Sequence, residues 1–88
     1  MFREFAQACA WTDAMLENGR YTGLIEYQVT RQGAPVEVLW VYAPGSRSVS
    51  EAEWQAQRML ERISDIDSAG RVHFDDGIIL QESYPWPV

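Results

Sequence analysis

Residues 65–76, with the sequence DIDSAGRVHFDD, decide how the second half of the chain folds. Aligned with a calcium-binding EF-hand loop, the segment offers aspartates at ligand positions 1, 3 and 12 and glycine at position 6. Position 5 is Ala69, which removes a ligand, and the apolar run after the segment predicts a strand where an EF-hand has a helix. We therefore predict a hairpin and no metal site. Asp67 and Ser68 would bond the turn backbone, and Gly70 would supply its unusual dihedral angles.

A helix is predicted just before this hairpin. Ser48 and Ser50 each precede a glutamate by three residues, and this spacing is the capping box that opens helices. Apolar residues then recur at helical spacing on one face, namely Ala52, Ala56, Met59, Leu60 and Ile63. A short strand is predicted over residues 71–74. The Asp-Gly pair at 76–77 is a strong hairpin signal, and residues 78–82 are predicted to pair back.

The first half of the chain is predicted to begin with a helix over residues 2–18. Apolar residues recur there at helical spacing, and the Asn-Gly pair at 18–19 would end the helix because glycine accepts left-handed backbone. Alternating residues predict strands over 21–30 and 36–43, separated by a turn. Both faces of the second strand are apolar, which predicts a central position in the sheet. The predicted helical stripe contains Phe2, Phe5, Cys9 and Leu16.

These elements predict an α+β fold in the order α-β-β-α-β-β. Four strands would form one mostly antiparallel sheet, with two helices packed on one face. At 88 residues, the chain is long enough for one modest core, so we expect a single globular domain over 1–88. Residues 83–88 are predicted to form an extended tail rich in proline and aromatic residues.

Composition and cysteine use predict a cytoplasmic protein. The chain is 47% hydrophobic and 12% aromatic, which argues against intrinsic disorder, and no apolar run reaches the length of a membrane span. The segment AQACA resembles a signal-cleavage site, but only a few residues precede it and they include Glu4. The single cysteine fits a reducing compartment.

The net charge of −6 is concentrated in the second half of the chain. Residues 1–50 carry five acids and four arginines, whereas residues 51–88 carry eight acids and three arginines. Such a balance repels phosphate backbones, so we expect no direct nucleic-acid binding. It favours a partner protein with a basic surface, or serves solubility alone.

Residue types suited to catalysis are few, and we predict that the protein is not an enzyme. His73 has aspartates nearby, but strand alternation predicts that it faces solvent. Cys9 lies on the predicted apolar stripe, which indicates a buried and inert thiol. A small hydrolase-type enzyme using Cys9 and His73 is the least favoured hypothesis. No glycine-rich phosphate loop or zinc set is present, so we expect no cofactor.

Exposed aromatic residues are the stronger functional candidates. Trp54 lies off the predicted core stripe, and Arg58 follows one helical turn later and could stack on its ring. Either a neighbouring segment covers Trp54, or the residue is a contact anchor, since Trp and Arg dominate binding hot spots. The tail around Trp86 has two similar possibilities, docking on a partner or folding back over the sheet near Trp40.

An acidic surface completes the predicted binding region. It is either a solvated face or a patch that occupies a basic groove. The residues that we predict to bind a partner are Glu51, Trp54, Arg58, Glu61, Asp65, Asp75 and Asp76.

These observations predict a small acidic protein that binds another protein as an inhibitor or modulator. In size, charge and α+β outline it resembles the small acidic proteins of phages and mobile elements, such as anti-CRISPR proteins. That resemblance rests on no motif, so it assigns no role to any residue. The alternative is a homodimer or assembly subunit joined through sheet edges or exposed aromatic residues.

Overall fold

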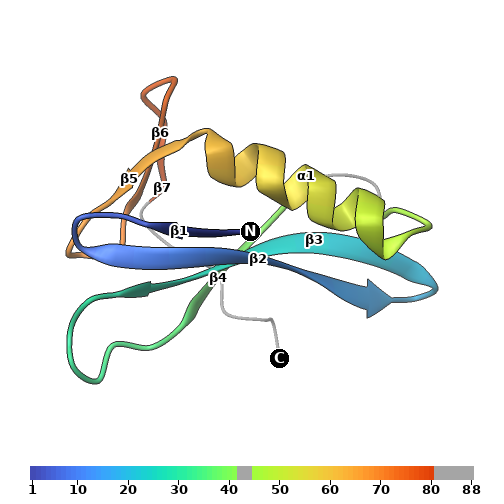
Figure 1. Cartoon of the computed structure of the whole chain (residues 1–88), viewed down its shortest axis with the longest axis horizontal. Coiled ribbons are helices and arrows are strands. Elements are labelled where there is room, and N and C mark those ends of the chain that lie inside the picture. Colours follow the sequence, from blue (N-terminus) through green and yellow to red (C-terminus); the bar gives the residue numbers. More distant parts are fainter. Residues whose placement is uncertain (42–44, 81–88) are drawn as a thin grey trace.

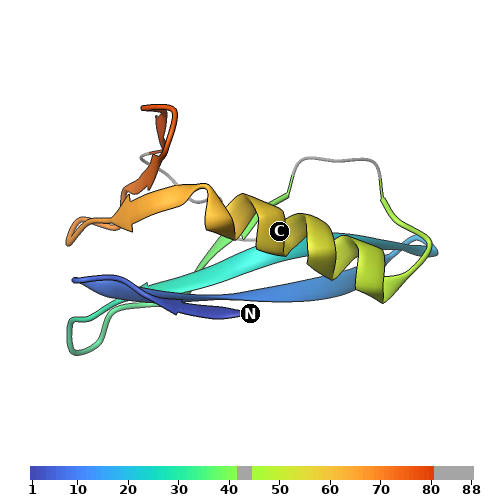
Figure 2. The same ribbon diagram turned by 45° about the horizontal axis from the view of Figure 1, so that its top comes forward.

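The computed structural model describes residues 1–41 and 45–80 and shows an α+β fold. A four-stranded antiparallel sheet, in the order β1-β2-β3-β4, carries helix α1 along one face (Figure 1). A three-stranded antiparallel sheet, β5-β6-β7, follows the helix. Figure 2 shows that α1 lies on one side of the larger sheet. The elements are β1 (Phe2–Glu4), β2 (Ala8–Glu17), β3 (Arg20–Val29), β4 (Glu37–Trp40), α1 (Val49–Glu61), β5 (Ile63–Ile66), β6 (Val72–Phe74) and β7 (Ile79–Leu80).

The prediction of a helix over residues 2–18 is wrong, because this segment forms β1 and β2. In β2 the small residues Ala8, Ala10 and Thr12 are buried, whereas the residues between them are half-buried and face the opposite side. Alanine is common in helices, and apolar residues on both faces conceal the period of two. Ten residue pairs between β2 and β3 make this segment a strand, because they satisfy the hydrogen bonds of its backbone. A local sequence pattern cannot show which distant strand supplies those bonds.

The Asn-Gly pair at 18–19 is a hairpin turn and not the end of a helix. Asn18 has φ 51° and Gly19 has φ 76°, and Glu17 pairs with Arg20 across them. Two consecutive residues with positive φ match the twist of the flanking strands, which makes Asn-Gly a favoured two-residue hairpin loop. This pair is the local signal that could have identified β2.

Only one helix is described, where two were predicted, and its start was predicted correctly. The Ser48 side chain caps α1 by accepting a hydrogen bond of 3.1 Å from the Glu51 N–H. The helix ends earlier than its apolar pattern indicates, because Arg62 is its C-cap and Ile63 begins β5. Arg3 stabilises this end from β1, since its Nη1 donates to the carbonyl oxygens of Leu60 and Ile63 at 2.7 and 2.9 Å.

The predicted strands of the second half do not join the first two in one sheet. Strand β3 is confirmed, but β4 lies at the sheet edge and not at its centre. Both faces of β4 are apolar, but each packs in a different place. Leu39 belongs to the core under α1, whereas Val38 and Trp40 face the opposite side of the sheet. Instead, β6 pairs with β5 on one side and with β7 on the other. The predicted strand residues 42–43 and 81–82 lie outside the described residues.

The turn predicted within residues 65–76 is present, with Ile66 paired to Val72 across it, but the strand before it, β5, was not predicted. The next predicted turn is also present. Gly77 has φ 91°, the Asp76 Oδ1 accepts the Ile78 N–H at 3.1 Å, and His73 pairs with Ile79 beyond it. A local hydrogen-bonding side chain followed by glycine is therefore sufficient to specify both turns.

The core lies between α1 and the larger sheet and continues into the smaller one. Gly23 in β3 lets the helix approach closely, because a Cβ at this position would overlap the backbone oxygen of Ala52. At the other end of the helix, the Tyr27 hydroxyl donates to the Gly70 carbonyl at 3.4 Å and links the two sheets. The central buried residues are Ala8, Ala10, Ile25, Tyr27, Leu39, Leu60, Ile63, Ile66 and Val72.

Candidate functional site

The outer face of α1 carries four of the predicted partner-binding residues. Trp54 is 56% exposed, so the described residues do not cover it. The Arg58 guanidinium carbon lies 5.1 Å from the centre of the Trp54 ring, as predicted from their spacing. Glu51 and Glu61 are exposed near either end of the same helix. Since Ala52, Ala56 and Leu60 are buried against the sheet, this outer face is free to make contacts in the described structure.

Asp75 and Asp76 lie near the end of α1, where Arg62 offsets part of their charge. Its Nη2 lies 3.0 Å from the Asp76 Oδ2 and its Nε lies 3.6 Å from the Asp75 Oδ1. The Asp75 N–H also donates to the Arg62 carbonyl at 2.8 Å, which attaches the β6–β7 turn to the helix end. All three side chains are more than two-fifths exposed, so these ion pairs are weak. Asp65 is exposed on β5, in register with His73.

Asp67 holds the β5–β6 turn together and is not available as a metal ligand. Its Oδ1 accepts the N–H groups of Ala69 and Arg71, each at 3.0 Å. Its Oδ2 lies 2.8 Å from the His73 Nε2 and 2.8 Å from the Arg71 Nε. The hydrogen bond from His73, followed by that from the Arg71 backbone, holds the pKa of Asp67 well below its usual range. Within residues 1–41 and 45–80, no three His, Cys, Asp or Glu side chains form a group that could hold a metal ion.

Cys9 and His73 lie in different sheets. Cys9 is half-buried on β2, on the face of the larger sheet opposite α1, and not on a helix as predicted. The His73 side chain is 31% exposed and is bonded to Asp67, so it faces its own turn more than solvent. These positions provide no geometric support for the hypothesis of a Cys9–His73 enzyme.

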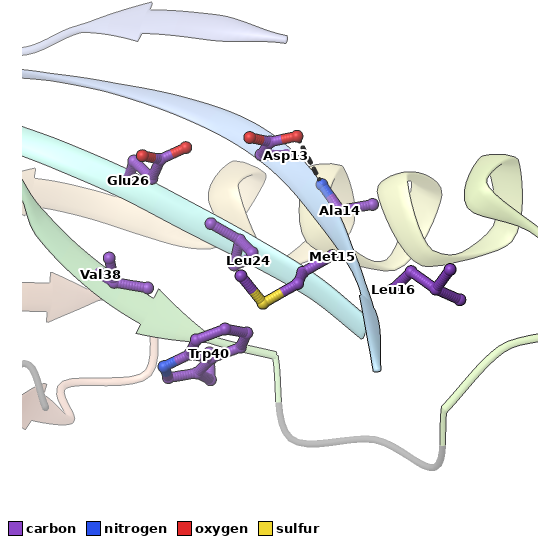
Figure 3. Close-up of a pocket in the computed structure, with 8 residues that line it drawn as sticks. All are labelled: Asp13, Ala14, Met15, Leu16, Leu24, Glu26, Val38 and Trp40. Carbon is purple, nitrogen blue, oxygen red and sulfur yellow. Dashed lines mark hydrogen bonds between the residues drawn. The ribbon is translucent and has the colours of Figure 1, made fainter. Parts of the chain in front are cut away.

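The second candidate site, a groove on the open face of the larger sheet, was not predicted. The term open face denotes the side of the larger sheet opposite α1, onto which described residues of β2, β3 and β4 project (Figure 3). The groove has a volume of about 410 Å³. Its described lining residues are Asp13, Ala14, Met15, Leu16, Leu24, Glu26, Val38 and Trp40.

Strand register explains how these residues meet. Leu24 pairs with Asp13 on one side and with Trp40 on the other, and Glu26 pairs with Val38. Leu24 is only 6% exposed and forms the floor of the groove, whereas Met15 is 41% exposed at its side. Strand alternation places Leu24 and Glu26 on one face of β3. The groove cannot be predicted from the expected helix over residues 2–18, because β2 forms one of its walls.

Two carboxylates give the groove its charge. Asp13 and Glu26 are diagonal neighbours on adjacent strands, within reach of each other. Burial raises the pKa of Glu26, and hydrogen bonding with the neighbouring Asp13 raises it further. The Trp11 Nε1 donates to the Glu26 Oε1 at 3.2 Å and opposes this effect. The Asp13 Oδ1 accepts the Ala14 N–H at 2.8 Å (Figure 3).

No protein-family model matches the chain, and comparisons with curated proteins and with solved structures found no significant match. In the part of the chain that the structure describes, no helix combines the length and apolar character needed to cross a membrane. The predicted tail over residues 83–88, including Trp86, lies outside the described residues. The outer face of α1 and the groove are therefore the two candidate binding surfaces among the described residues.

Proposed function

We propose that the protein binds another protein at a basic surface and acts as its inhibitor or modulator. The observation that carries this proposal is the exposed Trp54 ring stacked by Arg58 on the outer face of α1. Tryptophan and arginine are the residue types most enriched in binding hot spots, and a ring already held by its neighbour loses little freedom on binding.

Charge around this pair supports a basic partner. Glu51 and Glu61 lie on the same helix, and Asp75 and Asp76 lie beyond its end, where Arg62 offsets only part of their charge. Carboxylates at the rim of an interface attract a basic surface over distance and increase the association rate. The face is the outside of a helix, which offers contact area, so we expect it to act by covering the partner surface.

The specific form of this proposal is a cytoplasmic inhibitor that is encoded by a phage or mobile element and resembles anti-CRISPR proteins. Proteins that co-purify with the full chain would be identified by mass spectrometry, and the affinity of each would then be measured by calorimetry. We expect Trp54→Ala to lower the affinity for the true partner about thirtyfold, which is the loss that defines a strong hot spot. The same partner should bind more slowly at high salt because rim charges are screened.

Val36→Ala is the matched control, since it truncates another exposed apolar side chain, 47% exposed, just before β4. It should leave the affinity unchanged. A partner that binds Trp54→Ala and the unaltered chain equally would eliminate the outer face of α1 as the contact surface.

A homodimer remains the second candidate, because β2 extends past its β1 neighbour. The Thr12 N–H donates to the Met1 carbonyl, and alternation directs the backbone groups of Ala14 and Leu16 to that same edge. Leu16 is 58% exposed there, but the Asp13 carboxylate already occupies the Ala14 N–H. A charged side chain at an edge discourages strand addition. Light scattering over a concentration series tests this candidate, and a constant monomer mass would exclude it.

A further inference from the structure

The groove on the open face combines an apolar floor with an acidic end. Leu24, Val38 and Trp40 supply apolar surface, and Asp13 and Glu26 place two carboxylates beside it. None of the eight described lining residues is basic. We propose that this groove binds an arginine side chain of a partner protein, with the guanidinium group at Asp13 and Glu26 and the aliphatic stem along the floor.

Charge complementarity is the first argument for a cationic occupant. Two carboxylates on neighbouring strands repel each other, and the raised pKa of Glu26 follows from burial and from Asp13. A cation between them replaces this repulsion with two attractive contacts. Trp11 already holds one oxygen of Glu26 through a hydrogen bond of 3.2 Å, so the carboxylate is oriented before any ligand arrives.

The shape of the groove favours arginine over other cations. A guanidinium group is planar, can bond two carboxylates at once and stacks on aromatic rings. Trp40 provides such a ring, and the floor made by Leu24 and Val38 suits the three methylene groups of an arginine stem. A hard metal ion requires more oxygen ligands than Asp13 and Glu26 offer.

This site is separate from the outer face of α1. The helix packs against β2 and β3 from one side of the sheet (Figure 2), and the residues that line the groove lie on its open face. The two surfaces share no residue, so binding at one can be disproved without affecting the proposal for the other. A partner that uses both would have to reach around an edge of the sheet.

Nuclear magnetic resonance titration of the full chain tests the proposal. The probe is the peptide acetyl-Val-Arg-Val-amide, added to millimolar concentration. Matched peptides carry citrulline, which has nearly the same shape without the charge, or lysine in place of arginine. We expect amide shifts centred on Met15, Leu24 and Trp40, and binding of the citrulline peptide about tenfold weaker, because charge-assisted hydrogen bonds are lost.

Variants of the protein make the test specific. Glu26→Gln keeps the size of the side chain and should weaken the arginine peptide about tenfold for the same reason. Glu53→Gln makes the identical chemical change on α1 and should have no effect. Thermal unfolding of each variant, followed by circular dichroism, checks that the fold is retained. Trp40→Leu, which keeps an apolar wall without a ring, should remove the preference for arginine over lysine.

Several outcomes would overturn the proposal. Equal binding of the citrulline peptide, shifts confined to another surface, or no shifts at all would show that the groove does not recognise this cation. Equal binding of the lysine peptide would reject the assignment of a guanidinium group. Tighter binding of the arginine peptide by the Trp86→Ala variant would show that the chain's own C-terminal segment, and not a partner protein, is the occupant of the groove. Shifts of the same amides on dilution without peptide would indicate a second copy as the occupant.

Discussion

The two faces of the larger sheet differ in what covers them: α1 packs on one, and no described helix packs on the other. The face under α1 has Gly23 where the helix approaches closely, and Ala8 and Ala10 are buried on the same face. The open face has Met15 and Trp40 at comparable positions along the strands. Small residues let a helix lie close to the backbone, whereas large ones stand apart and leave a groove between them. We therefore expect stability to be concentrated on the covered face, and the proposed ligand to bind on the open face.

Neighbouring residues of β3 provide the strongest test of this difference. Ile25 is fully buried under α1, and Leu24 forms the floor of the groove. We expect Ile25→Ala to lower the free energy of unfolding by about 4 kcal/mol, because the closed core cannot collapse around the cavity. Leu24→Ala should cost about 2 kcal/mol, the lower end of such losses, because Met15 can move into the space. Equilibrium denaturation in urea measures both, and equal losses would show that the faces are packed alike.

Gly23 tests how closely the helix lies to the sheet. An added Cβ would overlap the Ala52 backbone oxygen, so Gly23→Ala should cost about 3 kcal/mol through overpacking. Gly33→Ala is the control, since its Cβ would meet no atom within 4 Å but its φ of 79° costs about 1 kcal/mol. A smaller loss at Gly23 than at Gly33, measured by the same denaturation, would contradict the close contact.

The helix cap tests whether the covered face depends on local structure. Ser48→Ala removes the hydrogen bond to the Glu51 N–H and should cost about 1 kcal/mol. Ser50 matches the same motif in the sequence but lies inside the helix and is exposed, so Ser50→Ala should cost nothing measurable. Thermal unfolding compares the two variants. A loss at Ser50 equal to that at Ser48 would mean that the helix begins two residues later.

The smallest effects concern pH, and they have opposite signs. Glu26 has a raised pKa, so its contribution to stability is greatest below the ordinary value of 4.5 and falls as pH rises through the raised pKa. Asp67 has a lowered pKa, so its contribution is present above the ordinary value of 3.8 and is lost as pH falls below it. At neutral pH, Glu26→Gln should therefore preserve or increase stability, whereas Asp67→Asn should reduce it.

Urea denaturation at neutral pH and in mild acid would measure this contrast. The difference between Asp67→Asn and the unaltered chain should shrink as the solution is acidified below the ordinary pKa of Asp67. A destabilised Glu26→Gln variant at neutral pH would show that the carboxylate on the open face is stabilising in its charged form, which would contradict the contrast.

The proposed binding surfaces differ in how far local sequence could reveal them. Trp54 and Arg58 are one helical turn apart, so their stacking followed from spacing alone. The groove needs Asp13 from β2, Glu26 from β3 and Trp40 from β4, and only strand pairing brings them together. A helix over residues 2–18 would lack the β2 residues that form one wall of the groove, so the prediction of this helix excluded the groove.

Local chemistry in the sequence determined the α+β class, the cap at Ser48, strand β3 and the turns held by Asp67 and Asp76. Each of these depends on groups a few residues apart. Tertiary structure alone decided that β4 lies at an edge and that the last strands form a second sheet. Strand pairing also decided that β2 is a strand, for which the Asn-Gly turn at 18–19 is a local signal. The reason is that backbone hydrogen bonds between strands join residues far apart in the chain, and their partners are selected by the whole fold.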